Sequence, residues 1–154
     1  MPLDVSAYLD GLKMLARREL SEAQIRQRLA RKGHSESDID EAVDRLRGER
    51  AIDDARVAEA IARTETSIRR RGKLRVRMQI QRAGIGKDLA KRAVDEVFSG
   101  IDDDELIEAS LRKRLHGRDT LADDREFQRL YRYLVGQGFE TDTIMRVLSR
   151  RKRK

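Results

Sequence analysis

Three glycines that recur at similar intervals constrain the fold of this chain more than any other feature of its sequence. Gly33, Gly84 and Gly138 are separated by 51 and 54 residues, and their surroundings match when the chain is laid against itself. An aliphatic residue lies four positions before each glycine and another lies eight positions before it, which places both on one face of a helix. These residues are Leu29, Ile80 and Leu134, and Ile25, Val76 and Leu130. The pattern predicts a helix that ends at each glycine, because a helix commonly ends in a left-handed residue that glycine adopts without strain.

A second amphipathic helix is predicted after each glycine, because an aliphatic pair follows nine and ten positions later. The pairs are Ala42 and Val43, Ala93 and Val94, and Val147 and Leu148. Ser35 and Thr141 are expected to cap the first and the third of these helices through their side-chain oxygens. In the middle copy Gly86 and Lys87 occupy that position, which predicts a weaker helix start.

A third helical stretch precedes each pair, over residues 5–18, 53–70 and 102–116. Ser21 and Gln24 fit a capping box for the helix after the first stretch. Acidic residues open the second and third stretches, and negative charge suits a helix N-terminus. Each copy of the repeat is therefore expected to hold three helices.

The predicted fold is all-α, with three tandem three-helix repeats over residues 1–50, 51–100 and 101–154. Because one such unit buries little apolar surface alone, we expect the units to stack as an elongated, curved array. Charged residues make up 41% of the chain and aromatic residues 4%, so small local cores are favoured over one large core. The first core should contain Leu12, Leu15, Leu20, Ile25, Leu29, Ile39, Val43 and Leu46.

The positive charge of the chain is unevenly distributed. Residues 69–98 hold 10 Lys and Arg against 3 acidic residues, and residues 149–154 hold 5 and none. Residues 1–68 and 99–148 each carry a small acidic excess. Such clustering indicates a polyanionic or acidic partner more strongly than a solvated helix face.

The basic segment from residue 69 onward is the most informative stretch for function. On a helix that starts near Lys73, the inward face would hold Val76, Ile80 and Ala83, and the outward row Arg75, Gln79 and Arg82. Guanidinium groups in such a row can contact phosphates or carboxylates without reading bases. The expected filament- or DNA-binding residues are Arg69, Arg70, Arg71, Lys73, Arg75, Arg77, Arg82, Lys87, Lys91 and Arg92. The terminal basic run, residues 150–154, is expected to be a frayed helix end or a solvated tail.

Candidate catalytic groups are scarce. His34 and His116 lie in different units without metal-ligand companions at helical spacing, and cysteine is absent. The stretch 84–87 lacks the spacing of a phosphate-binding loop and is interpreted as a turn between helices. We therefore expect a protein that is not an enzyme and uses no cofactor, metal or small-molecule substrate. No apolar run approaches the ~18 residues of a membrane span and no secretory signal is evident, which favours a cytoplasmic location without membrane contact.

The helix-turn-helix pattern does not by itself predict a reader of DNA sequence. In such readers the second helix enters the major groove, close to dense phosphate charge. The second helix of the first unit, residues 35–47, carries five acidic residues against two arginines. Phosphates would repel that helix, so the first unit is not expected to enter a groove.

The sequence resembles the RecX family of RecA regulators over nearly its whole length. The matching stretches, in order, are Leu15–Glu22 with Ile25, Leu29, Lys32 and Gly33, then Ile52–Ala58, Arg71–Gly72, Ile80, Ala83–Ile85, Ala93–Val94 and Tyr133–Phe139 without Val135. The family often has an aromatic residue where this chain has Val57 and commonly a proline where it has Lys73. The order and spacing of these stretches carry the resemblance, since no one of them is specific.

This resemblance implies a protein that binds the RecA filament on single-stranded DNA and limits its growth, ATP turnover, strand exchange and coprotease activity. Weak direct contact with DNA would accompany this. Bridging contacts between filament subunits would bias assembly by differential binding. One alternative is a general nucleic-acid-binding module in which RecA plays no part. Another is an adaptor that binds helical proteins through apolar grooves.

Overall fold

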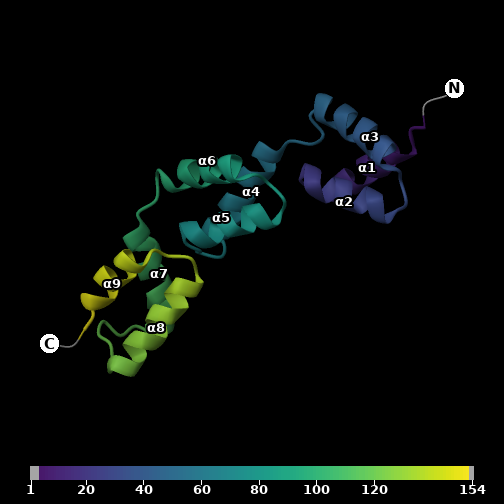
Figure 1. The fold of residues 1–154 in the computed structure, drawn as a ribbon. Coiled ribbons are helices and arrows are strands. Elements are labelled where there is room, and N and C mark those ends of the chain that lie inside the picture. Colours follow the sequence, from purple (N-terminus) through teal and green to yellow (C-terminus); the bar gives the residue numbers. More distant parts are fainter. Residues whose placement is uncertain (1–3, 153–154) are drawn as a thin grey trace.

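The computed structural model describes residues 4–152, and within that range the chain forms nine α-helices and no strand. The helices are α1 (Ser6–Arg17), α2 (Glu22–Arg31), α3 (Glu36–Gly48), α4 (Asp54–Ser67), α5 (Lys73–Arg82), α6 (Lys87–Phe98), α7 (Asp103–Leu115), α8 (Asp124–Gly136) and α9 (Thr141–Ser149). Figure 1 shows them as three groups of three that lie in a row, with the two chain ends at opposite ends of an elongated molecule. No helix in the described part is long and apolar enough to cross a membrane.

Each group of three helices has its own apolar core. We call the groups unit 1 (α1–α3), unit 2 (α4–α6) and unit 3 (α7–α9). The three clusters of buried residues each come from the helices and turns of one unit. Leu106 of α7 packs against the clusters of both unit 2 and unit 3, so these two cores are adjacent. The expected local cores are thus present, and in unit 1 only Leu12 and Leu15 of the predicted set are partly rather than fully buried.

Most of the helix boundaries follow from the capping residues. Ser21 accepts from the backbone N–H of Gln24 while the Gln24 side chain accepts from the Ser21 N–H, which is the predicted capping box. Ser35 also caps as predicted. Thr141 does not, because it is the first helical residue of α9 and Glu140 occupies the N-cap without a side-chain cap bond. Gly86 is the N-cap of α6 and makes no side-chain cap bond, so the weaker start of this helix stays a prediction.

Neighbouring units are joined in the same way twice. We call each contact a joint, formed where the N-terminus of one unit's second helix meets the glycine turn of the next unit. In the first joint the Ser21 hydroxyl donates to the Ala83 carbonyl. In the second, the Gly72 N–H donates to the Gln137 carbonyl at 2.8 Å. Ala83 and Gln137 each directly precede the turn glycine, so the two joints are equivalent in the repeat.

The turn glycines have left-handed backbones, as predicted, but only two of them lie in joints. A Cβ on Gly84 would collide with Ala23 of α2, and a Cβ on Gly138 would collide with Arg75 of α5. Gly33 has the same conformation, φ +94°, yet a Cβ there would meet nothing within 4 Å, because no unit precedes unit 1 in the described chain. The same turn residue therefore ends a helix in all three units and permits close packing in two.

The basic segment after α9 folds back onto unit 3. Arg151 pairs with Glu108 of α7, and the Leu121 N–H donates to the Arg151 carbonyl at 2.9 Å. Arg150 lies 3.3 Å from Asp104, and Lys152 lies over the Phe127 ring. The expectation of a frayed or solvated tail is wrong for residues 150–152, and residues 153–154 lie outside the described part of the chain.

Candidate functional site

The ten predicted binding residues all lie in unit 2, and the structure separates them into two groups. One group, Arg71, Lys73 and Arg75, packs where α5 begins, beside unit 3. The other seven are exposed: Arg69, Arg70, Arg77, Arg82, Lys87, Lys91 and Arg92. The two groups differ in what their charges contact.

Arg71 neutralises a buried carboxylate of its own unit. Its Nη1 lies 2.9 Å from Oε2 of Glu65, a residue that is only 8% exposed near the end of α4. Arg69 is a second and longer partner of that carboxylate, at 3.7 Å. A buried charge is costly unless it is paired, so Arg71 mainly holds the segment between α4 and α5 in place.

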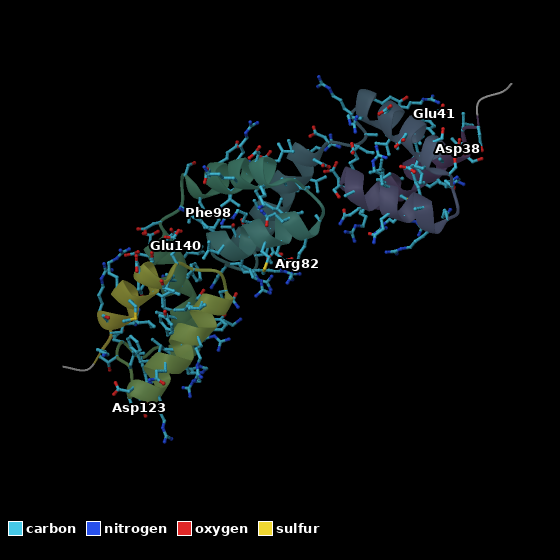
Figure 2. All side chains as sticks on the ribbon, in the orientation of Figure 1. Asp38, Glu41, Arg82, Phe98, Asp123 and Glu140 are labelled. Atoms are coloured by element: carbon cyan, nitrogen blue, oxygen red, sulfur yellow. The ribbon has the colours of Figure 1, made fainter. Side chains whose placement is uncertain are left out.

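Lys73 and Arg75 contact unit 3 across the second joint. Lys73 Nζ lies 3.7 Å from Asp103 Oδ2 and above the Phe98 ring, and Figure 2 places Phe98 close to this junction. Arg75 Nη1 donates to the Gly136 carbonyl at 2.7 Å. Burial raises the pKa of Asp103, because desolvation disfavours its charged form more than Lys73 stabilises it. Both cations therefore help to fix unit 3 on unit 2.

Five of the exposed cations lie on α5 and α6, and we call them the exposed basic surface of unit 2: Arg77, Arg82, Lys87, Lys91 and Arg92. The predicted outward row of α5 is only partly exposed, because Arg75 and Gln79 are half-buried and only Arg82 is exposed. Figure 2 shows Arg82 at the surface of α5. Among the described residues, no ion pair involves Arg77, Arg82, Lys87, Lys91 or Arg92. Leu74 and Met78, 47% and 38% exposed, lie on α5 beside these cations and add apolar area to the surface.

A second basic region, which sequence analysis missed, lies between unit 2 and unit 3. A cavity of about 600 Å³ is lined by Arg69 and Arg70 from unit 2 and by Lys113, Arg114 and Arg129 from unit 3. The net charge of the sequence did not indicate this region, because residues 99–148 have an acidic excess overall. The acidic residues of α7 lie in its first half and the basic ones in its last turn. The positions of these charges, and not their sum, could therefore have indicated a basic region at the end of α7.

The two histidines lie at turns that follow helices. His34 Nε2 lies 2.7 Å from Asp10 Oδ2, beside the turn of unit 1, and this contact holds the pKa of Asp10 below its usual value. His116 is the left-handed C-cap residue of α7. Within residues 4–152, no group of three His, Cys, Asp or Glu side chains is placed to hold a metal ion.

Models of the RecX family match the first and the last unit. Residues 7–46 match the first three-helix domain of RecX, and residues 102–148 match its third three-helix domain. A solved structure titled regulatory protein RecX superimposes with a TM-score of 0.78 at 22% identity, over 94% of this chain and 70% of the other. RecX from Lactobacillus salivarius gives 0.75 at 19%, over 93% and 92%. These two likenesses confirm the all-α fold.

Curated relatives cover nearly the whole chain. The regulatory protein RecX of Acidithiobacillus ferrooxidans is 36% identical over 140 residues, which are 90% of this chain and 85% of the relative. That of Syntrophotalea carbinolica is 29% identical over 93% of this chain and 94% of its own. A longer relative from Geobacillus kaustophilus is 32% identical, and the match spans 53% of its length. Each is named a regulatory protein, in agreement with the non-enzymatic role expected from the sequence. The chain therefore belongs to the RecX family of regulatory proteins.

Proposed function

We propose that the chain binds the RecA filament on single-stranded DNA and limits its extension, ATP turnover, strand exchange and coprotease activity. The observation that carries this proposal is the match of nearly the whole chain to proteins named regulatory protein RecX. The elongated array adds support, because three units in a row can contact more than one subunit of a polymer. The proposed place of action is the cytoplasm, together with RecA.

The exposed basic surface of unit 2 is the proposed contact with the filament. Its five cations on α5 and α6 have no acidic partner within the described chain, so they are available to carboxylates or phosphates. Leu74 and Met78 add apolar area of the kind that is buried at the centre of protein interfaces. A contact that holds filament subunits in one spacing stabilises that state over those that growth and ATP turnover require.

The test reverses charge in the exposed group and spares the joint. The double variant Arg77→Glu with Arg82→Glu should raise the concentration that half-inhibits RecA ATP hydrolysis on single-stranded DNA about tenfold, or roughly 1.4 kcal/mol. Arg112→Glu with Arg125→Glu is the matched control, because both arginines are exposed on other helices, neither is in an ion pair among the described residues, and the net charge change is the same. Superimposable inhibition curves for the two doubles would remove the unit 2 surface from the mechanism.

The second candidate function is nucleic-acid binding that does not need RecA, and the basic cavity between units 2 and 3 favours it. This function predicts tight binding to bare oligonucleotides with a steep dependence on salt. If the chain acts only through the filament, binding to bare DNA is weak while ATPase inhibition is strong. Measuring both quantities in one buffer separates the two functions.

A further inference from the structure

The cavity between units 2 and 3 has the size and the lining of a binding site. Its volume of about 600 Å³ lies within the roughly 300–1,000 Å³ of ligand pockets. One wall is the end of α4 and the segment after it, and the other comes from α7 and α8. Arg70 and His116, one on each wall, have left-handed backbones with φ of 53° and 51°. Because both units supply lining residues, the cavity exists only when the second joint is closed.

The charge of the lining is strongly positive. Its lysine, arginine and acidic residues are Arg69, Arg70, Lys113, Arg114 and Arg129 against Glu126. Glu126 is already satisfied, because Arg118 approaches it at 2.7 Å and 3.1 Å and the Ala122 N–H donates to it. The hydrogen bonds from Arg118 hold the pKa of Glu126 below its usual value, so this carboxylate is ionised and engaged.

Three of the five cations have no acidic partner in the described part of the chain. No ion pair within residues 4–152 involves Arg70, Lys113 or Arg114, and the ion pairs of Arg69 and Arg129 are long, at 3.7 Å and 3.6 Å. Cations gathered around one cavity without counter-charges repel each other. A polyanion that enters would relieve this repulsion and release its own counterions.

The lining also offers a flat surface for a base. The guanidinium of Arg114 lies 3.4 Å from the centre of the Tyr133 ring, so the two planes are stacked at the cavity wall. Ile68, 76% exposed, adds an apolar edge on the opposite wall. Unstacked bases bind to aromatic rings and guanidinium planes, whereas an acidic peptide needs the cations alone. The stack therefore favours single-stranded nucleic acid as the occupant.

We propose that this cavity binds single-stranded nucleic acid directly. Arg69, Arg70, Lys113 and Arg129 contact successive phosphates, and one base lies against the stack of Arg114 and Tyr133. This rests on the second candidate function and deepens it, because it names the residues that contact the strand and assigns a role to unit 3. It also places strand binding at the second joint, so an occupied cavity holds units 2 and 3 in their closed arrangement.

The test measures binding of the whole chain to a fluorescent oligo-dT by anisotropy across a salt series. The double variant Lys113→Gln with Arg129→Gln should weaken binding at least tenfold. It should also reduce the slope of log affinity against log salt by about 1.4, that is, ~0.7 for each lost phosphate contact on a single strand. The matched control is Arg112→Gln with Arg125→Gln, exposed on the same two helices but outside the cavity lining. Equal losses in both doubles would overturn the site, because they would reflect net charge alone.

Two further measurements separate the occupants. Arg114→Lys keeps the charge but removes the planar group, so it should erase the preference of the unchanged chain for oligo-dT over an abasic strand of equal length. Absence of that preference in the unchanged chain would contradict the role of the stack. Polyglutamate that displaces the oligonucleotide as efficiently as unlabelled DNA would instead identify an acidic protein segment as the occupant and overturn the proposal. Thermal melts confirm that each variant is folded.

Failure of this proposal and failure of the proposed function give different results. If the cavity does not bind a strand, the Lys113 and Arg129 double leaves binding to bare oligonucleotide unchanged, while the Arg77 and Arg82 double still weakens RecA inhibition. If RecA is not the partner, ATPase inhibition is absent in every variant and oligonucleotide binding still depends on the cavity.

Discussion

At the second joint, burial and ion pairing have opposite effects on the charge of Asp103. Asp103 is half-buried, its Oδ1 has no hydrogen-bond partner among the described residues, and Lys73 stands 3.7 Å from its other oxygen. The pKa of Asp103 is raised in the folded chain, first because of burial. Asp103 therefore favours folding while it is protonated, and this contribution is lost as pH rises through its folded pKa.

Asp103→Asn should consequently raise the melting temperature at pH 7, by about 1–3 °C for a chain of this size. The gain should disappear at a pH low enough to protonate Asp103 in the unchanged chain, since both side chains are then neutral. Differential scanning calorimetry of both proteins at the two pH values measures this. A variant that melts lower than the unchanged chain at pH 7 would show that the contact with Lys73 outweighs desolvation.

Residue identity predicted local contacts well and distant contacts poorly. Ser21 and Gln24 lie three residues apart in one turn, so their capping box could be predicted from spacing alone. The pairing of Arg71 with Glu65 could not, because it needs the chain to reverse at Arg70, whose φ of 53° has no signature in the sequence. Arg71 was for this reason predicted to face a partner rather than its own unit.

At the scale of helices and turns, identical sequence signals have different structural roles. Each turn glycine ends a helix, but Gly84 and Gly138 also lie against the preceding unit whereas Gly33 does not. Helix periodicity showed which residues face a core, and it could not show which turn meets a neighbouring unit. That contact depends on the angle between units, which no short-range pattern encodes.

Gly84→Ala and Gly33→Ala should therefore differ in cost. Both force alanine into a left-handed backbone, which costs roughly 1–2 kcal/mol. Gly84→Ala adds a collision with Ala23 and should open the first joint, so its urea midpoint should fall clearly further than that of Gly33→Ala. Circular dichroism of the two variants at equal concentration makes the comparison. Equal urea midpoints for the two variants would mean that the first joint accommodates the extra methyl group without loss of stability.

The whole molecule behaves as a linear array, because each unit has its own core and contacts only its neighbours along the row. Unit 2 is supported on both sides and the outer units on one side only. In such arrays the stability of a unit is the sum of its own stability and that of its interfaces. Unit 2 should therefore be the last to open.

Hydrogen exchange in mild denaturant should show this order, with the slowest amides in α4 and α5. Gly84→Ala should speed exchange in units 1 and 2 and leave unit 3 nearly unchanged, because only the first joint is altered. Mass spectrometry of peptides from each unit provides the measurement. Uniform acceleration across all nine helices would indicate a single cooperative domain.

The repeat length and the all-α class followed from the sequence, since both depend on periodic signals within one unit. The cavity between units 2 and 3 did not. Its lining residues, from Ser67 to Tyr133, are up to 66 positions apart and are brought together only by the second joint. Basic residues in unit 3 were hidden by acidic ones that the fold places at the other end of the same helix.

In both joints, the second helix of one unit contacts the glycine turn of the next unit. This repeated contact determines where a further three-helix unit could be added to the chain. The second helix of unit 3 begins after Asp123, which Figure 2 places at the far end of the molecule, and the segment after α9 covers this end through the bond between Leu121 and Arg151. A duplicated unit inserted between existing units would find a ready partner on both sides, whereas one appended after unit 3 would have to displace that segment. We therefore expect longer proteins of this kind to have arisen by duplication of an internal unit.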